Sequence, residues 1–335
     1  MTSRADLHVH SKHSNQPAEW ILRLFRSPES FTEPRDVYRL CRERGMDFVT
    51  ITDHDSIDGA LEIAHLPGTF LSEEVTAEFP EDGCEVHILV YGITETQHRE
   101  IQALRLNLYE LRDYLRAEDV LCSVAHPLYR VNGRTTLAHV EKLLVLFDRF
   151  ETLNGMHDRR LNGLARLILS SLSAELIDEL AGRHRLEPWG DRPWVKQFTG
   201  GTDDHCGLFP ATTWTGTLAA SSVDEYLDHL RAGRCDAGGA TGTTERLARS
   251  LRVLAHEYLR RQAPAHLAGM ADWLDRRLLG VAARQVAIHT HGHGSNLLDH
   301  AALRFLGRRP VWRSLRSAGR ARLETNEAAG RTIAA

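Results

Sequence analysis

Histidines and carboxylates recur in this chain at a spacing that suits a metal site at strand ends. His8 and His10 stand two apart in Asp6-Leu7-His8-Val9-His10, and ligand-type residues return at the same spacing in Asp203-Asp204-His205. Side chains two apart on a strand project to the same side, so each pair could bind one cation from a strand end. Two such pairs, far apart in the sequence, predict a site at the mouth of a barrel or sheet.

Further residues of these types stand between the two pairs, each at the end of a predicted strand or inside one. They are Asp53, His54, Glu74, His87 and His126. Imidazole and carboxylate ligands suit zinc, manganese or iron, and the lack of a cysteine at these positions argues against a structural zinc–thiolate site. The residue types therefore predict a catalytic centre that binds divalent metal ions.

Such a centre would supply the chemistry of phosphate ester hydrolysis. Divalent ions lower the pKa of bound water from about 16 towards about 7, polarise a phosphoryl oxygen and neutralise charge on the leaving oxygen. His205 or Asp53 could orient the nucleophile or the leaving group. Four basic side chains are candidates to bind the phosphate, namely Lys12, Arg130, Arg134 and Arg159. For each arginine the competing interpretation is a solvated helix face or an ion pair.

The elements that must position these residues alternate along the chain. Apolar runs predict strands at residues 48–51, 70–72, 86–91, 121–125, 147–153, 198–203 and 214–218, and helical periodicity predicts helices at residues 34–45, 58–65, 95–118, 136–146, 159–180 and 223–231. This alternation indicates parallel β/α units, whose active sites form at the carboxyl ends of the strands. Asn154-Gly155 follows one of these strands and either shapes a loop or touches substrate, since Asn-Gly is a strong turn former.

A glycine-rich segment at residues 238–242 marks a boundary in the chain. We expect a catalytic domain over residues 1–237, a helical region over residues 243–317 and a flexible tail over residues 318–335. Within the helical region, periodicity predicts helices at 245–261, 265–279 and 297–306. These helices could cover the site as a lid, join two copies of the chain in a homo-oligomer, or bind a partner.

Composition narrows the classes of function. The 335 residues are 42% hydrophobic and carry a formal net charge of -4, so we expect a large core and no nucleic-acid partner. The 5 cysteines are odd in number and show no Cys-x-x-Cys spacing, which predicts a reduced, cytoplasmic setting. No signal peptide is recognisable and no run approaches the roughly 20 apolar residues of a membrane span, so we expect no membrane insertion.

Taken together, six separated motifs resemble those of the PHP (polymerase and histidinol phosphatase) superfamily of metal-dependent phosphoesterases. In order, they are Asp6-Leu7-His8-Val9-His10-Ser11, Thr50-Ile51-Thr52-Asp53-His54-Asp55-Ser56-Ile57-Asp58-Gly59, Glu74-Val75-Thr76, Val86-His87-Ile88-Leu89, Ala125-His126-Pro127 and Gly200-Gly201-Thr202-Asp203-Asp204-His205. The resemblance covers residues 1 to about 235. It implies an α/β fold, a distorted seven-stranded β/α barrel of PHP type with a trinuclear metal centre, followed here by a C-terminal α-helical extension.

Carried over residue by residue, the resemblance assigns ligands to two or three metal ions. His8, His10, Glu74 and Asp203 would bind one ion, Glu74 would bridge to a second ion bound also by His87 and His126, and His54 and His205 would bind a third. At the third site the family usually has an Asp or His where this chain has Asn15. A neutral amide oxygen is a weaker ligand, so the third ion could bind less tightly, differ in identity or arrive with the substrate.

Three functions are open at this point. The first is a phosphoric ester hydrolase that hydrolyses a small phosphomonoester or phosphodiester by metal-activated hydroxide. The second is an amidohydrolase-type hydrolase, but many of its members bridge their metals with a carboxylated lysine, and Lys12, Lys142 and Lys196 are not placed for that role. The third is a non-catalytic metal-binding module that supports a partner such as a glycosyltransferase, because relatives with a similar amino-terminal sequence are often linked to glycosyltransferases.

Overall fold

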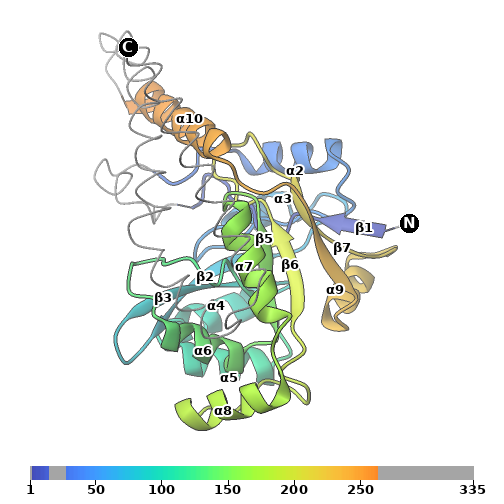
Figure 1. Ribbon diagram of the computed structural model, residues 1–335. Coiled ribbons are helices and arrows are strands. Elements are labelled where there is room, and N and C mark those ends of the chain that lie inside the picture. The colour runs from blue at the N-terminus through green and yellow to red at the C-terminus, as the bar shows by residue number, and fades with distance from the viewer. Residues whose placement is uncertain (1, 15–27, 263–335) are drawn as a thin grey trace, which may run out of the picture.

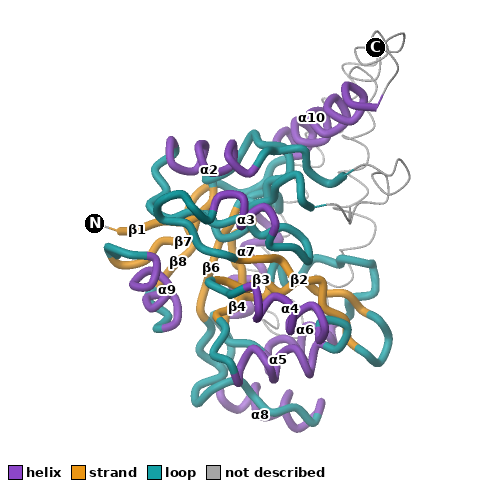
Figure 2. Tube along the Cα trace, turned by 180° about the vertical axis from the view of Figure 1, so that it is seen from behind, coloured by secondary structure: helices purple, strands orange, loops and turns teal. Residues whose placement is uncertain are grey.

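The strands of the protein form two open sheets. The computed structural model describes residues 2–14 and 28–262 (Figures 1 and 2). The strands are β1 (Thr2–Ala5), β2 (Ser72–Phe79), β3 (Cys84–Tyr91), β4 (Leu121–Val124), β5 (Arg149–Asn154), β6 (Gln197–Gly201), β7 (Thr213–Leu218) and β8 (Cys235–Gly239). The larger sheet has 5 strands in the order β2-β3-β4-β5-β6, and the smaller has 3 strands in the order β1-β7-β8.

The predicted seven-stranded β/α barrel is wrong, because neither sheet of the described residues closes on itself. β2 pairs antiparallel with β3, and β3 pairs antiparallel with β4, whereas a β/α barrel requires parallel neighbours. The link from β2 to β3 is a short turn that includes Gly83 at a φ of 66°. A turn this short can join only antiparallel strands, since a parallel pair needs a crossover of a dozen or more residues.

Two segments predicted as strands lack a regular ladder. The His-x-His segment that follows β1 is held by an isolated parallel bridge from Val9 to Asp204, and the apolar run 48–51 is held by one from Val49 to Thr69. Both segments still run beside the sheet ends. Their polar side chains therefore reach the same region without a closed barrel.

The predicted helices are present, but the two longest are interrupted. The helices are α2 (Pro34–Glu43), α3 (Asp58–Ile63), α4 (Glu95–Leu104), α5 (Leu108–Ala117), α6 (Leu137–Leu146), α7 (Arg159–Leu169), α8 (Ala174–His184), α9 (Val223–Arg231) and α10 (Thr244–Gln262). Asn107 caps α5 by accepting from the Tyr109 amide, and Ser173 caps α8 by accepting from the Leu176 amide. Side chains of this kind satisfy the first amides of a new helix, so α4–α5 and α7–α8 are separate helices.

The main core lies between the five-stranded sheet and the helices that follow its strands. Val75, Ile88 and Phe150 from the sheet belong to one buried cluster with Leu111 of α5 and Leu143 of α6. Figures 1 and 2 show α5, α6 and α8 together at one end of the molecule, with α2 and α10 at the other. The helices α5, α6 and α8 therefore do not cover the carboxyl ends of the strands or the loops near α2, and a site can form there.

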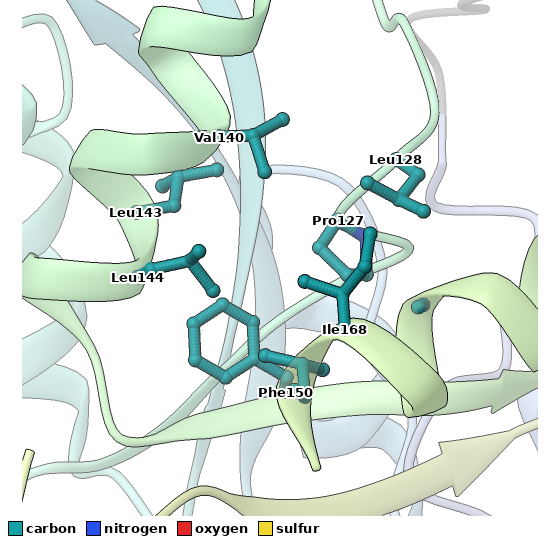
Figure 3. Close-up of a pocket in the computed structure, with 9 residues that line it drawn as sticks. Pro127, Leu128, Val140, Leu143, Leu144, Phe150 and Ile168 are labelled. Carbon is teal, nitrogen blue, oxygen red and sulfur yellow. The ribbon is translucent and has the colours of Figure 1, made fainter. Parts of the chain in front are cut away.

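A small cavity inside this core carries no polar group. It measures about 10 Å³ and is lined by nine apolar residues, among them Val140, Leu144, Phe150 and Ile168 (Figure 3). Such a space is about the size of one water molecule, and water needs polar partners. We therefore regard it as a packing defect and not as a ligand site.

The glycine-rich segment at 238–242 begins inside the smaller sheet. β8 pairs antiparallel with β7 up to Gly239, just past the predicted boundary at residue 237. A Cβ on Gly238 would lie 2.3 Å from the Trp214 ring, so packing on this tryptophan requires glycine. α10 confirms the helix predicted at 245–261, whereas the helices predicted at 265–279 and 297–306 and the tail at 318–335 lie outside the described residues. Among the described helices, none combines the length and hydropathy of a membrane span.

Candidate metal centre

Six histidines and two carboxylates from distant segments converge on one buried cluster. Their ligand atoms form four groups, each within 4.8 Å: His8, His10 and Asp203; His8, Glu74 and His126; His54, Glu74 and His87; and His10, His54 and His205. These are the predicted ligands except Asn15, which lies outside the described residues. The structure thus brings together side chains that the sequence separates by up to two hundred positions.

Alternation along the first segment points its histidines into the cluster. Val9, between His8 and His10, is buried in a small core with Val37 of α2 and Ile51. Because successive side chains on an extended segment face opposite ways, burial of Val9 directs both histidines to the other side. β6 approaches closely here, since a Cβ on Gly201 would lie 2.3 Å from the His8 Cβ. The glycines of the last motif therefore serve the packing of its strand against the first motif.

Two ligand residues adopt backbone conformations that are unusual for side chains other than glycine. His126 has a φ of 26° and Asp203 a φ of 53°. A positive φ costs free energy in a residue other than glycine, and it persists only where neighbouring contacts stabilise it. The His126 amide donates to Glu151 Oε2 at 3.0 Å, and the Asp203 amide donates to the His8 carbonyl at 2.6 Å. These bonds fix the turns that aim both side chains at the cluster.

Glu74 of β2 lies at the centre of the cluster. Its Oε2 is 3.2 Å from His8 Nε2, 3.3 Å from His10 Nε2 and 3.1 Å from His54 Nδ1, and its Oε1 is 2.8 Å from His87 Nδ1 and 3.2 Å from His126 Nε2. Burial raises the pKa of Glu74, but the imidazoles of His8, His87 and His54 outweigh burial and hold it well below its usual value. One ionised carboxylate thus faces five imidazoles.

Several of these neighbouring atoms make no hydrogen bond. Within the described residues, His8 Nε2, His10 Nε2, His87 Nδ1 and Glu74 Oε2 are buried at ion-pair distance from an oppositely charged group, but without the alignment of a hydrogen bond. Leaving buried polar atoms in this state costs roughly 1–3 kcal/mol each. Bound cations would remove this cost, because the same nitrogen and oxygen atoms are good ligands for divalent metals. The residue set therefore fits divalent metal ions.

Charge is unevenly distributed over the imidazoles. Burial lowers the pKa of His8, but Asp203, Glu74 and Glu151 raise it more, so the net pKa is well above its usual value. The pKa of His54 reaches about 10, because the carboxylates of Glu74 and Glu29 outweigh its burial. Burial and the neighbouring His10 lower the pKa of His205 to about 4. Metal ions would therefore compete with protons for His8 and His54, whereas His205 is already neutral.

Glu151 and Asn154 of β5 hold the ligands from behind. Glu151 Oε1 accepts a hydrogen bond from His8 Nδ1 at 3.0 Å, and Asn154 Nδ2 donates to Glu151 Oε2 and to Asp203 Oδ2, both at 2.9 Å. A carboxylate at Nδ1 leaves Nε2 of His8 as the ligand nitrogen. The sequence analysis missed Glu151; an acidic residue inside an apolar strand run was the available signal.

Asp53, predicted as a catalytic candidate, also lies behind the ligands. Its carboxylate accepts hydrogen bonds from the Ser11 amide and hydroxyl, each at 2.6 Å, and from Ser14 Oγ at 2.9 Å. Ser14 Oγ in turn lies 3.0 Å from His10 Nδ1. This geometry suits a residue that positions His10 through Ser14. The other catalytic candidate, His205, lies in the cluster itself.

The four predicted phosphate-binding residues make contacts of other kinds. Lys12 pairs with Glu33 at 2.8 Å and Glu62 at 3.4 Å, Arg130 donates to the Gly133 carbonyl, Arg134 donates to the Asp82 carbonyl at 2.7 Å, and Arg159 is exposed at the first residue of α7. Among the described residues, none of these contacts involves a cluster side chain. Their role in substrate binding stays a prediction.

Two aromatic residues that the sequence analysis missed flank His126. The His157 ring lies 5.5 Å from the His126 ring and 4.9 Å from the Tyr129 ring. Burial and the neighbouring His126 lower the pKa of His157 to about 4. A neutral imidazole beside a candidate ligand could donate or accept a hydrogen bond there.

A cavity of about 430 Å³ opens beside the cluster, between α2 and α10. His205 and Cys206 line it on the cluster side, with Thr32 just before α2, Arg39 on α2 and Leu254 on α10. Figures 1 and 2 both show α10 next to α2. A substrate could therefore approach His205 from this side.

Comparisons with known proteins do not assign the chain to a family. No family model matches it. An uncharacterized protein of Methanocaldococcus jannaschii is 38% identical over 72 residues, which are 22% of this chain and 40% of that protein. The chain thus matches less than half of the length of that relative.

Two solved structures are similar over larger parts of the chain. PsfC from Pseudomonas syringae PB-5123 matches with 14% identity and a TM-score of 0.41, over 78% of this chain and 98% of its own. A candidate metal-dependent phosphoesterase from Bifidobacterium adolescentis matches with 16% identity and a TM-score of 0.35, over 68% of this chain and 95% of its own. Similarity at this level carries no argument about function, so the case for the metal centre comes from the residues of this chain.

Proposed function

We propose that the chain is a metal-dependent phosphoesterase that hydrolyses a small phosphomonoester or phosphodiester. The cluster around Glu74 is the observation that carries this proposal. Its eight side chains are nitrogen and oxygen ligands, and their ligand atoms lie within 4.8 Å in each of four groups. Several of these atoms are buried without a hydrogen-bond partner among the described residues. A structural role alone does not explain so many buried, ionisable atoms facing one another.

The donor set suggests which residues would bind the ions. His8, His10, Glu74 and Asp203 would bind one ion, and Glu74, His87 and His126 a second. Divalent cations bound in this way would supply an activated hydroxide and would neutralise phosphoryl charge. Other side chains orient the ligand imidazoles. Glu151 orients His8, and Ser14 together with Asp53 orients His10. Rigid ligands of this kind keep the reacting groups in register.

The lysines weigh against an amidohydrolase with a carboxylated lysine. Lys196 Nζ donates to the carbonyls of Leu144 and Phe147, both at 2.6 Å. Lys142 pairs with Glu81, and Lys12 pairs with Glu33. The chain has no other lysine. The bridging position in the cluster is instead occupied by the Glu74 carboxylate.

The test is hydrolysis of p-nitrophenyl phosphate and bis(p-nitrophenyl) phosphate by metal-stripped protein supplemented with Mn²⁺, Zn²⁺ or Fe²⁺. We expect metal-dependent turnover that Asp203→Ala abolishes. Asp228→Ala, which removes an exposed carboxylate from α9, is the matched control and should retain full turnover. Metal uptake without turnover of either ester would contradict the proposal and favour a metal-binding module.

A further inference from the structure

Glu29 lies against the cluster although no sequence motif points to it. Its side chain is buried, with Oε2 at 3.1 Å from His54 Nε2 and Oε1 at 3.7 Å from His205 Nε2. A buried carboxyl group therefore faces the ring nitrogens of two predicted ligands.

Glu29 supplies what one of the four groups lacks. Three groups contain Glu74 or Asp203, whereas His10, His54 and His205 form a group of imidazoles alone. Neutral imidazoles contribute no negative charge to offset the charge of a divalent cation. Metal sites that contain histidines therefore often include a carboxylate oxygen as a further ligand. The carboxylate of Glu29 stands beside two of these three histidines.

The same serine that orients the histidines also fixes Glu29. The Glu29 amide donates to the Ser14 carbonyl at 3.1 Å, and the His54 amide donates to Ser14 Oγ at 3.2 Å. Ser14 Oγ also lies 3.0 Å from His10 Nδ1 and donates to Asp53. One hydrogen-bonded network thus positions the carboxylate and two imidazoles together. An accidental contact of a surface glutamate would not share this support.

This part of the cluster adjoins the large cavity. Phe31 and Thr32, which follow Glu29 closely in the chain, line that cavity together with His205. Glu74, by contrast, has 0% of its surface exposed. An ion held near His205 would therefore exchange with solvent more readily than one held by Glu74.

We propose that Glu29 is a ligand of a third divalent cation, which it binds together with His54 and His205. This inference rests on the proposed metal centre. At the third site the family resemblance implies a weak amide ligand from Asn15. A carboxylate from Glu29 would instead give that site a negatively charged oxygen ligand.

The experiment counts metal ions bound to the full-length chain. Wild type and variants are equilibrated with excess Mn²⁺ or Zn²⁺, freed of unbound ion and analysed by elemental mass spectrometry. We expect three ions in wild type and one fewer in Glu29→Gln and in His205→Ala. Because both residues serve the same ion, the double variant should lose no more than either single variant. Glu43→Gln, an exposed glutamate on α2, is the control and should bind as wild type does.

Each other result is decisive. A Glu29→Gln variant with the full complement, or a double variant that loses two ions, overturns the inference while leaving the proposed function intact. A wild-type chain that binds two ions does the same, whereas one that binds none contradicts the proposed function itself. If Glu29→Gln does not fold, Glu29→Asp replaces it, with an expected loss of about tenfold or more in affinity for one ion only. Unchanged affinity for all ions in that variant overturns the inference.

Discussion

The inner and outer halves of the cluster are built in different ways. The inner half surrounds Glu74 of β2 and includes His87 of β3, and both side chains are buried. Its ligands have partners behind them, such as Glu151 of β5 behind His8. The outer half contains Glu29 and His205, which follow loops and border a cavity of about 430 Å³. Sites on regular elements are held more rigidly than sites on loops. We infer that the inner half carries the hydrolytic chemistry. The outer half controls how substrate reaches the cluster and how an ion exchanges with solvent.

Removal of the central carboxylate tests the inner half most severely. Glu74→Gln takes away the one charge shared by five imidazoles, so we expect loss of two ions and a fall in kcat/KM of at least about 10³-fold, or about 4 kcal/mol. Metal analysis and kinetics on the phosphate esters measure both effects. Full metal content in this variant would contradict the central role of Glu74.

A change behind the ligands should have a smaller effect. In Glu151→Gln a neutral amide replaces the charged carboxylate that accepts the hydrogen bond from His8 Nδ1. We therefore expect metal affinity to fall by roughly 10–100-fold. Titration with a competing chelator gives this number. Glu100→Gln on the exposed face of α4 is the matched control. Equal affinity in both variants would remove Glu151 from the centre.

Acid should weaken metal binding, and the sign follows from the imidazoles. The pKa of His54 is raised to about 10 by the neighbouring carboxylates, and that of His8 is also raised. Cations must therefore displace bound protons, and the proton concentration that opposes them rises as pH falls. Each displaced proton lowers the apparent affinity about tenfold per pH unit. Chelator competition at pH 8 and pH 6 measures the slope. An affinity independent of pH would show that these histidines are not ligands.

The mildest expected change lies outside both halves. Arg134 is exposed and donates to the Asp82 carbonyl in a surface turn. Arg134→Ala should alter the free energy of unfolding by no more than about 0.5 kcal/mol. We also expect kcat/KM on the two esters to stay within about twofold. A tenfold loss of kcat/KM would instead support the phosphate-binding role predicted from the sequence.

The candidate ligands could be predicted because each stands in a short motif whose spacing is a local property. His8 with His10, and Asp203 with His205, are examples. The barrel was predicted wrongly because the strand predicted at 70–72 continues as β2 to Phe79, and the short turn from there to β3 makes these two neighbours antiparallel. Glu29 could not be predicted because it belongs to no motif, and its place beside His54 depends on a backbone contact with Ser14 that only the folded chain makes. Similarly, the side chain of Asn107 caps the start of α5 and so divides a helix that the apolar periodicity predicted as continuous.

The close approach of Gly201 to His8 has a consequence for the order of folding. The first and last motifs support each other directly, for the Thr202 amide donates to Asp6 Oδ1 across a separation of 196 residues. Closing so long a loop is a late event in a growing chain. A ribosome-bound chain that ends before β6 therefore lacks one wall of the proposed centre, so we expect stable metal uptake only after synthesis has passed His205.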